Sequence, residues 1–283
     1  MRKRTAGALL SALLIGLGVP AQAAGARDVA GLPTQLELGD SWTYGQGASD
    51  PESGGYAGIV HQTNLSALDC LPSADVELGF LGCRQLQREI LARPATEALP
   101  GVTTDTVIAE QLDSAAALLE SRNGDSNPRN DVEVVLLSVG GNDVFGPVIG
   151  ACLGGLDPQC IGVINERLDH VEQNLDHILG SVRAGSGEDA LIVVVTYDNP
   201  IAFCPLGAVP GAIALGGLVL EGHPLLGITG LNNVIRDTAA THGVLVADTF
   251  GQLGEGDWVG DCLHPNDAGH AAIADIVSAT ITG

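Results

Sequence analysis

Five short apolar segments alternate along the chain with longer segments of helical periodicity, and this alternation restricts the fold more than any other feature. The expected strands cover residues 35–38, 86–92, 132–139, 191–196 and 244–247. The expected helices, in which apolar residues recur at steps of three and four, cover residues 56–68, 104–121, 161–182, 225–242 and 265–281. Near-continuous apolar strands are typical of a sheet that is covered on both faces. The sequence therefore predicts a three-layer α/β/α sandwich with a central parallel sheet of about five strands.

The first 23 residues have the three parts of a secretory signal peptide. They carry three basic residues at positions 2–4, an apolar run over residues 8–19, and Ala-Gln-Ala at 21–23. The apolar run is too short to span a bilayer, so we expect cleavage after Ala23 and no stable membrane anchor. No repeat or linker divides residues 24–283, which we interpret as one domain of a secreted protein.

The charge of the chain limits its partners. Twelve basic and 34 acidic residues give a formal net charge of −22. A chain this acidic repels phosphate backbones and anionic membranes, which argues against a nucleic-acid partner. We expect a monomer whose partner is a small substrate.

Six cysteines agree with an oxidising compartment. None of them has the spacing of a metal site such as C-x-x-C. Six cysteines allow 15 pairings, and the sequence alone does not choose among them. Pairing of neighbours closes the shortest loops, and we therefore expect the disulfides Cys70–Cys83, Cys152–Cys160 and Cys204–Cys262.

Two of the expected strands end in short motifs that could form part of a reaction site. The first strand runs into Gly-Asp-Ser-Trp at residues 39–42, where the glycine permits a sharp turn and Ser41 can project into a cleft. The third strand runs into Gly-Gly-Asn-Asp at residues 140–143, and the amide of Asn142 can donate a hydrogen bond to an oxyanion. Each motif taken singly is also typical of an ordinary turn, and we expect Asp40 to hold its turn rather than to act in catalysis.

A third motif, Asp-Cys-Leu-His-Pro at residues 261–265, follows the last expected strand. Asp261 lies three residues before His264 and can accept a hydrogen bond from its Nδ1, which leaves Nε2 free to take a proton. An isolated pair of this kind can equally be a surface feature. Together, however, the three motifs supply the nucleophile, base, orienting carboxylate and oxyanion donor that ester hydrolysis needs. Since the carboxyl ends of parallel strands meet at one edge of a sheet, we expect the motifs to converge in one cleft.

With these residues the chain resembles the SGNH hydrolases, the family of GDSL esterases and lipases. The resemblance implies that Ser41 is the nucleophile, that His264 is its base and that Asp261 orients the base. It also implies an oxyanion hole formed by Asn142 and by the backbone N–H of Ser41.

The family's remaining oxyanion donor is a glycine, for which Gly101 in the segment Leu-Pro-Gly-Val-Thr-Thr is the candidate. Trp42 departs from the leucine of the family name, at a position that varies within the family. The resemblance is closest to secreted bacterial esterases with three sequential disulfides, and it implies that neither a metal nor a cofactor is needed.

We therefore expect a hydrolase of carboxylic esters that acts through an acyl-enzyme. Apolar segments over residues 145–149 and 205–210, expected as loops after the third and fourth strands, favour lipid or aryl esters, although such segments could simply be core. The alternatives are an acyltransferase that uses the same site and a non-catalytic secreted binding module on the same fold. A glycosidase finds little support, because no pair of carboxylates stands out by position.

Two further expectations concern the last helix and the aromatic residues. Pro265 suits the first position of that helix, and His270 is expected on its surface. Tyr197 and Trp258 could line the cleft or belong to the core.

Overall fold

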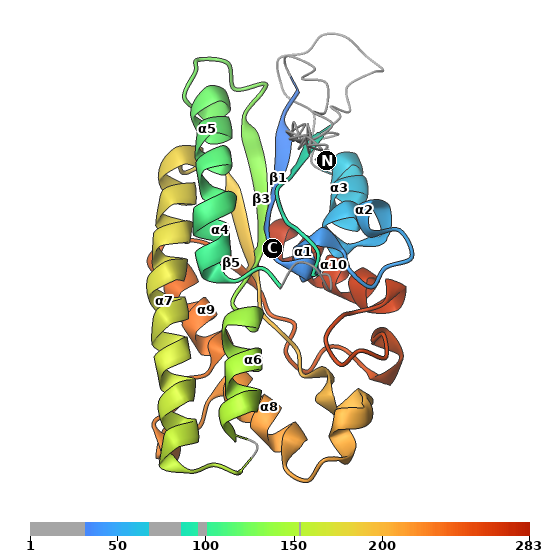
Figure 1. Cartoon of the computed structure of the whole chain (residues 1–283). Coiled ribbons are helices and arrows are strands. Elements are labelled where there is room, and N and C mark those ends of the chain that lie inside the picture. The colour runs from blue at the N-terminus through green and yellow to red at the C-terminus, as the bar shows by residue number, and fades with distance from the viewer. Residues whose placement is uncertain (1–31, 68–85, 96–100, 153) are drawn as a thin grey trace, which may run out of the picture.

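The computed structural model describes residues 32–67, 86–95, 101–152 and 154–283 (Figure 1). Over this part of the chain five parallel strands form one sheet in the order β2-β1-β3-β4-β5. The strands are β1 (Thr34–Gly39), β2 (Gln87–Ile90), β3 (Val132–Ser138), β4 (Leu191–Val195) and β5 (Leu245–Ala247). The parallel five-stranded sheet confirms the architecture that the sequence predicts.

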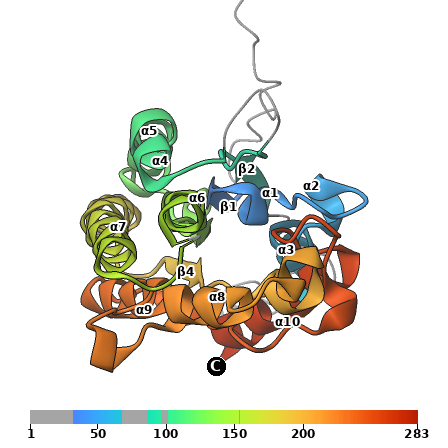
Figure 2. The same ribbon diagram turned by 60° about the horizontal axis from the view of Figure 1, so that its bottom comes forward.

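Helices cover both faces of the sheet (Figures 1 and 2). One layer contains α4 (Thr104–Glu110), α5 (Leu112–Asn123), α7 (Pro158–Ser186) and α9 (Leu231–Thr241). The other contains α3 (Tyr56–Ala67) and α10 (Asp267–Thr282). The longest helix, α7, begins where the Asp157 side chain accepts a hydrogen bond from the Cys160 N–H, with Pro158 at the first helical position.

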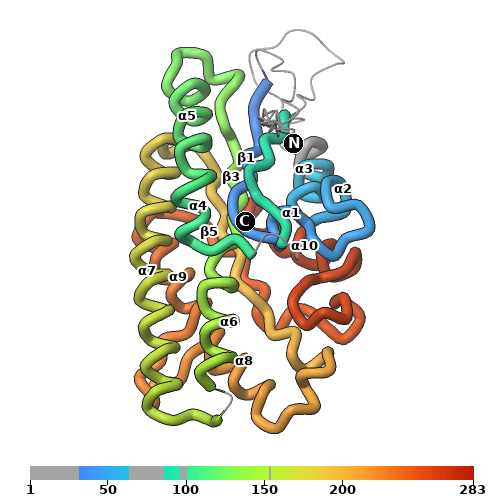
Figure 3. The backbone as a smooth tube through the Cα atoms, in the orientation of Figure 1, coloured from blue at the N-terminus to red at the C-terminus, as the bar shows by residue number. Residues whose placement is uncertain are grey.

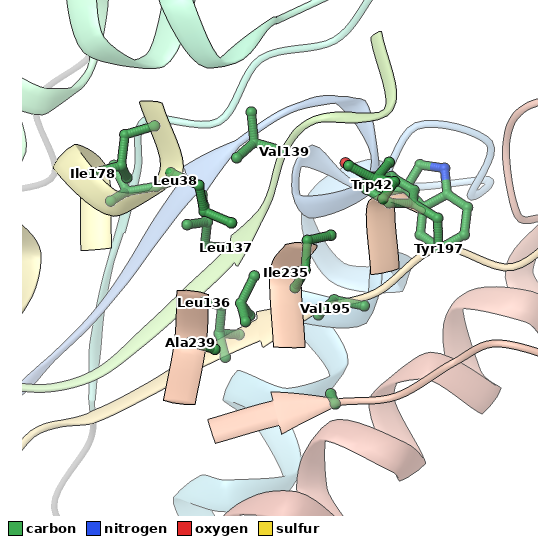
Figure 4. Close-up of a cluster of buried hydrophobic side chains, with 14 of the residues drawn as sticks. Leu38, Trp42, Leu136, Leu137, Val139, Ile178, Val195, Tyr197, Ile235 and Ala239 are labelled. Atoms are coloured by element: carbon green, nitrogen blue, oxygen red, sulfur yellow. The ribbon is translucent and has the colours of Figure 1, made fainter. Parts of the chain in front are cut away.

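The core lies between these layers and the sheet. Leu38 of β1 is the register partner of Leu137 of β3, and both belong to one buried cluster with Ile178 of α7 (Figure 4). Burial on this scale stabilises the fold by about 25 cal/mol for each Å² of apolar surface removed from water. A rigid sheet of this kind holds the strand ends in place, and those ends carry the predicted motifs.

All five strands end at the same edge, which points toward the lower end of the molecule in Figures 1 and 3. The elements that follow the strands gather there. They are α1 (Ser41–Tyr44), α6 (Gly141–Cys152), the 3₁₀ turns η1 (Pro200–Phe203), η2 (Pro205–Ala208) and η3 (Pro224–Leu226), and α8 (Ala212–Glu221). The remaining short elements are α2 (Pro51–Gly54) and η4 (Glu255–Asp257).

Several predicted boundaries are wrong for identifiable reasons. Residues 145–149, expected as a loop, lie within α6, and their glycine and proline conceal the helical pattern. The helix expected over 104–121 is two helices separated at Gln111, whose side chain bonds to β1 instead. Pro265 does not begin the last helix, because Asn266 caps it by accepting from the N–H groups of Ala268 and Gly269.

Two of the expected disulfides, Cys152–Cys160 and Cys204–Cys262, are present. The expected Cys70–Cys83 pair and the signal peptide at 1–23 lie outside the described residues. Within those residues, none of the helices combines the length and apolar character that crossing a membrane requires.

Candidate active site

Ser41, His264 and Asp261 form a continuous chain of hydrogen bonds. The Ser41 Oγ lies 2.9 Å from His264 Nε2, and His264 Nδ1 lies 2.6 Å from Asp261 Oδ2. Ser41 and His264 are buried, while the Asp261 side chain is 43% exposed. Because a carboxylate can only accept, it favours the tautomer with a proton on Nδ1, which leaves Nε2 able to accept the hydroxyl proton.

The end of β1 is built to present Ser41. Gly39 has a φ of 110°, and a Cβ there would lie 2.0 Å from the Ser138 carbonyl oxygen, so the turn requires glycine. The buried amide of Gln111 accepts from the Gly39 N–H at 2.7 Å and donates to its carbonyl at 2.9 Å. Asp40 then caps α1 by accepting from the Trp42 N–H at 3.0 Å, which makes Ser41 the first helical residue.

The Asp40 carboxylate is part of a buried network and does not bond to the His264 ring. It accepts from the Tyr197 hydroxyl at 2.5 Å and from Ser138 Oγ at 2.7 Å. Burial raises the pKa of Asp40 to about 6, although the hydrogen bonds from Tyr197, Ser138 and the Trp42 backbone act in the opposite direction. Asp40 thus holds the turn, in the manner expected from the sequence.

The loop that carries His264 is held at several points. Asp261 Oδ1 accepts from the backbone N–H groups of Leu263 at 2.9 Å and of His264 at 3.0 Å. Burial raises the pKa of Asp261, but hydrogen bonds from the His264 ring and from these two N–H groups outweigh it, so the pKa lies below its usual value. Asp261 is therefore ionised near neutral pH.

Two contacts attach this loop to the rest of the molecule. The Trp42 indole donates to the Leu263 carbonyl at 3.0 Å. Cys262, which adopts a left-handed φ of 65°, forms its disulfide with Cys204 at the end of η1.

Asn142 and Gly101 lie side by side. A Cβ on Gly101 would lie 2.5 Å from Asn142 Cγ, so only glycine fits against the amide. Asn142 Nδ2 donates one hydrogen to the Val102 carbonyl at 3.0 Å and has a second to offer. Asn142 also lines the same pocket as Ser41 and His264. The structure therefore brings together all five residues that the sequence proposes.

Asp143 holds the two segments of the predicted oxyanion hole in register. Its carboxylate accepts from the Thr104 N–H at 3.0 Å and from the Thr104 hydroxyl at 2.6 Å. This contact joins the start of α6 to the start of α4. Neither this role nor that of Gln111 has a sequence signal, because each side chain bonds to a residue far away in the chain.

The pocket above Ser41 has a volume of about 210 Å³. Its apolar walls include Phe145 and Ile149 of α6, and Ile201 and Leu206 of η1 and η2. A second, larger groove of about 710 Å³ shares Ile149, Ile201 and Leu206 with it. The predicted apolar segments therefore do line the cleft, although the first of them is helical.

Trp42, Tyr197, Trp258 and His270 occupy interior positions. Trp42 lies edge-on to Tyr197, with ring centroids 5.0 Å apart, and 5.9 Å from the Trp258 ring. Figure 4 shows Tyr197 beside Trp42, and Tyr197 lines the pocket as well. The expectation of a surface His270 is wrong, because its ring is fully buried and accepts from the Tyr56 N–H. Among the described residues, no group of three or more His, Cys, Asp or Glu is placed to hold a metal ion.

Comparisons with known proteins identify a family and a fold. A family model described as the GDSL-like Lipase/Acylhydrolase family matches residues 38–272. The crystal structure of the lipase Lip_vut3 from a goat rumen metagenome is 16% identical, with 88% of this chain and 97% of that chain covered and a TM-score of 0.57. None of the curated proteins matches the chain.

Two carbohydrate-active structures are also similar. Axe2, an acetylxylan esterase from Geobacillus stearothermophilus, is 17% identical over 89% of this chain and 97% of its own, with a TM-score of 0.49. A Clostridium thermocellum family 3 carbohydrate esterase is 16% identical over 89% of this chain and 96% of its own, with a TM-score of 0.45.

Proposed function

The chain belongs to the GDSL-like lipase/acylhydrolase family, and on that basis we propose that it is a secreted serine esterase that hydrolyses carboxylic esters with an apolar acyl or aryl group. One observation carries the proposal. The Ser41 hydroxyl is hydrogen-bonded to His264, which is hydrogen-bonded to Asp261, and this chain opens into a pocket that Asn142 also lines.

The first half of the proposed reaction forms an acyl-enzyme. His264 Nε2 takes the proton of Ser41 as its oxygen attacks the ester carbonyl, and Asp261 stabilises the imidazolium that results. The tetrahedral oxyanion accepts hydrogen bonds from the second amide hydrogen of Asn142 and from the backbone N–H groups of Ser41 and Gly101. The Ser41 N–H suits this role because the first N–H groups of a helix have no acceptor within it.

Collapse of the tetrahedral intermediate completes the acyl-enzyme, and its hydrolysis is the second half. The imidazolium gives its proton to the leaving alcohol, and the carbonyl re-forms as a Ser41 ester. Water then attacks that ester with His264 as its base, passing through the same oxyanion site. The acid is released and the Ser41 hydroxyl is restored.

The pocket lining supports an apolar substrate over an acetylated sugar. Recognition of sugar hydroxyls needs polar groups with free hydrogen-bonding capacity. Asp198 lines the pocket, but its carboxylate already accepts from the N–H groups of Gly251 at 3.0 Å and Leu253 at 2.9 Å. Asp40 is similarly engaged, and the remaining wall around Phe145 and Ile149 is apolar.

The proposal is tested by labelling with a serine-reactive phosphonate and by hydrolysis of a chromogenic short-chain ester. We expect the parent protein to be labelled on Ser41, and Ser41→Ala to lose both the label and the activity. Ser121→Ala, which changes an exposed serine on α5, is the matched control and should behave like the parent. If Ser41→Ala hydrolysed the ester like the parent, the assignment would be wrong.

The same experiment separates the alternatives. A binding module would take no label on Ser41. An acyltransferase would take the label but, when an acceptor alcohol is added, would give the new ester as the main product instead of the free acid.

A further inference from the structure

Exposed apolar side chains lie on four elements that each contribute residues to the groove. We call this set the apolar face, and its members are Phe203, Leu206, Val209, Ile213, Leu225 and Leu226. They come from η1, η2, α8 and η3, at the lower end of the molecule in Figure 1. Leu225 is the extreme case, with 93% of its surface exposed. Such a concentration of exposed large apolar side chains on neighbouring elements marks an interaction site rather than ordinary surface composition.

The other exposed large apolar side chains of the described residues border the same region. They are Ile149 and Leu156, which line the groove, and Leu263, which lines the reaction pocket. Exposed large apolar side chains are therefore concentrated at the mouth of the site, and scattered exposure does not explain them.

The charge pattern identifies the kind of partner. The segment 199–235 contains a single acidic residue, Glu221, and neither lysine nor arginine. Its carboxylate pairs with Arg236 at 2.9 Å, which offsets its charge. The whole chain meanwhile carries a formal net charge of −22. An anionic surface would be repelled, and a charged protein surface would find no complementary charge on this face.

The face is continuous with the path to the nucleophile. Leu206 belongs to the face and lines both the groove and the reaction pocket, and Val209 and Leu226 also line the groove. The groove, at about 710 Å³, has the size of a site for a molecule much larger than the pocket alone could hold. An acyl chain that entered from the face would reach the pocket along apolar walls.

We infer that this apolar face docks on a lipid surface without net charge, and that the groove leads an acyl chain from that surface to Ser41. Burial of the exposed leucine, isoleucine and phenylalanine side chains in the interface drives docking, while the acidic remainder of the protein stays in water. The delivery of an acyl chain rests on the proposed esterase function. Docking itself does not, and it can be measured without catalysis.

The test measures binding of Ser41→Ala protein, which does not consume the lipid, to vesicles by co-sedimentation. We expect binding to phosphatidylcholine vesicles and weaker binding to phosphatidylglycerol vesicles at low ionic strength. Leu225→Asp and Ile213→Asp should each lower the partition onto phosphatidylcholine by about tenfold or more. Both residues are exposed, so folding, checked by the thermal unfolding midpoint, should be unaffected.

The matched control is Ala117→Asp, which adds the same charge at an exposed position of α5, on another part of the molecule (Figure 1). It should bind phosphatidylcholine like the Ser41→Ala parent. The inference is overturned if the parent does not bind phosphatidylcholine, or if Leu225→Asp and Ile213→Asp bind as well as Ala117→Asp. It is also overturned if sedimentation shows a dimer that both aspartate variants dissociate, because the face would then be covered by a second copy. Activity toward a dissolved ester with no vesicle binding would remove the docking but leave the esterase proposal intact.

Discussion

Asn142 is the side chain whose chemistry can be isolated most cleanly. One of its amide hydrogens is donated to the Val102 carbonyl at 3.0 Å, and the residue lines the pocket with a second hydrogen to donate. Asn142→Ala should lower kcat by about 10²–10³-fold, because one oxyanion donor is lost. The loss of the Val102 contact should lower the free energy of unfolding by only about 1 kcal/mol. Steady-state hydrolysis of a short-chain ester, with urea unfolding alongside, checks both values. A kcat within twofold of the parent would remove Asn142 from the oxyanion hole.

Asp40 links the reaction site to the pH dependence of stability. Its pKa is about 6 in the folded protein, against an ordinary value of 3.8, so between these values the folded protein holds a proton that the unfolded chain has released. Stability from this group is therefore fully present below the lower value and is lost as the pH rises through the upper one.

Asp40→Asn should remove this dependence. Between about pH 5 and about pH 7 the parent should lose about 1.4 kcal/mol more stability than the variant. Over these two pH units the folded protein holds on average about half a proton more than the unfolded chain, and each proton held over one pH unit corresponds to about 1.4 kcal/mol. Urea unfolding of both proteins at the two pH values gives the comparison. Parallel pH dependences in parent and variant would show that Asp40 does not bind the proton.

Among the elements, the loop before α10 depends most on a single covalent contact. The Cys204–Cys262 disulfide ties this loop to η1, and Cys262 lies two residues before His264. Replacing both cysteines with serine should lower kcat by about tenfold or more, because small displacements of a catalytic base are costly. The loss of kcat should be seen at temperatures well below the thermal unfolding midpoint of the variant, where the variant is still folded.

The second disulfide provides the comparison. Cys152–Cys160 joins the end of α6 to the start of α7, across a separation of 8 residues. Its double serine variant should hydrolyse a dissolved acetyl ester at close to the parent rate. Equal losses in the two double variants would mean that the disulfides act through general stability and not through the His264 loop.

At the scale of the whole molecule, we expect the reaction pocket and the groove together to set the preferred length of the acyl chain. The pocket of about 210 Å³ suits a short acyl group, and the groove of about 710 Å³ extends it. Ala214 is an exposed residue of α8 that lines the groove but not the pocket. Ala214→Trp should lower kcat/KM for a decanoyl ester by about tenfold, because about two CH₂ groups of the acyl chain lose their burial in the groove. The value for an acetyl ester, which does not reach the groove, should not change.

Gly217→Trp adds a similar side chain elsewhere on α8. A Cβ at Gly217 meets open space, and the residue is not part of the groove lining. This variant should keep the parent's chain-length profile. If the two tryptophan variants changed that profile equally, the groove would not be the acyl site.

Local patterns were sufficient to predict the sheet and the residue types at the ends of its strands. The apolar runs at β3 and β4 lie within a residue of their predicted bounds, because burial on both faces produces a continuous apolar strand. Helices interrupted by glycine, such as α6 and α8, escaped prediction, because their stability comes from packing rather than from propensity. His270 escaped for the same reason, since its burial depends on Tyr56 and Gln46, which are more than 200 residues away in the chain.

The sequence by itself determined the chain order of the five strands and the chemistry that follows the first, third and last of them, because hydrophobic periodicity and turn residues act over a few neighbouring positions. Only the tertiary structure decided the 2.9 Å contact between Ser41 and His264, the support of Gly39 by Gln111, and the joining of pocket to groove. These features join residues remote in the chain. Their distances are set by how the packed sheet and helices bring remote segments together, and no local pattern encodes that packing.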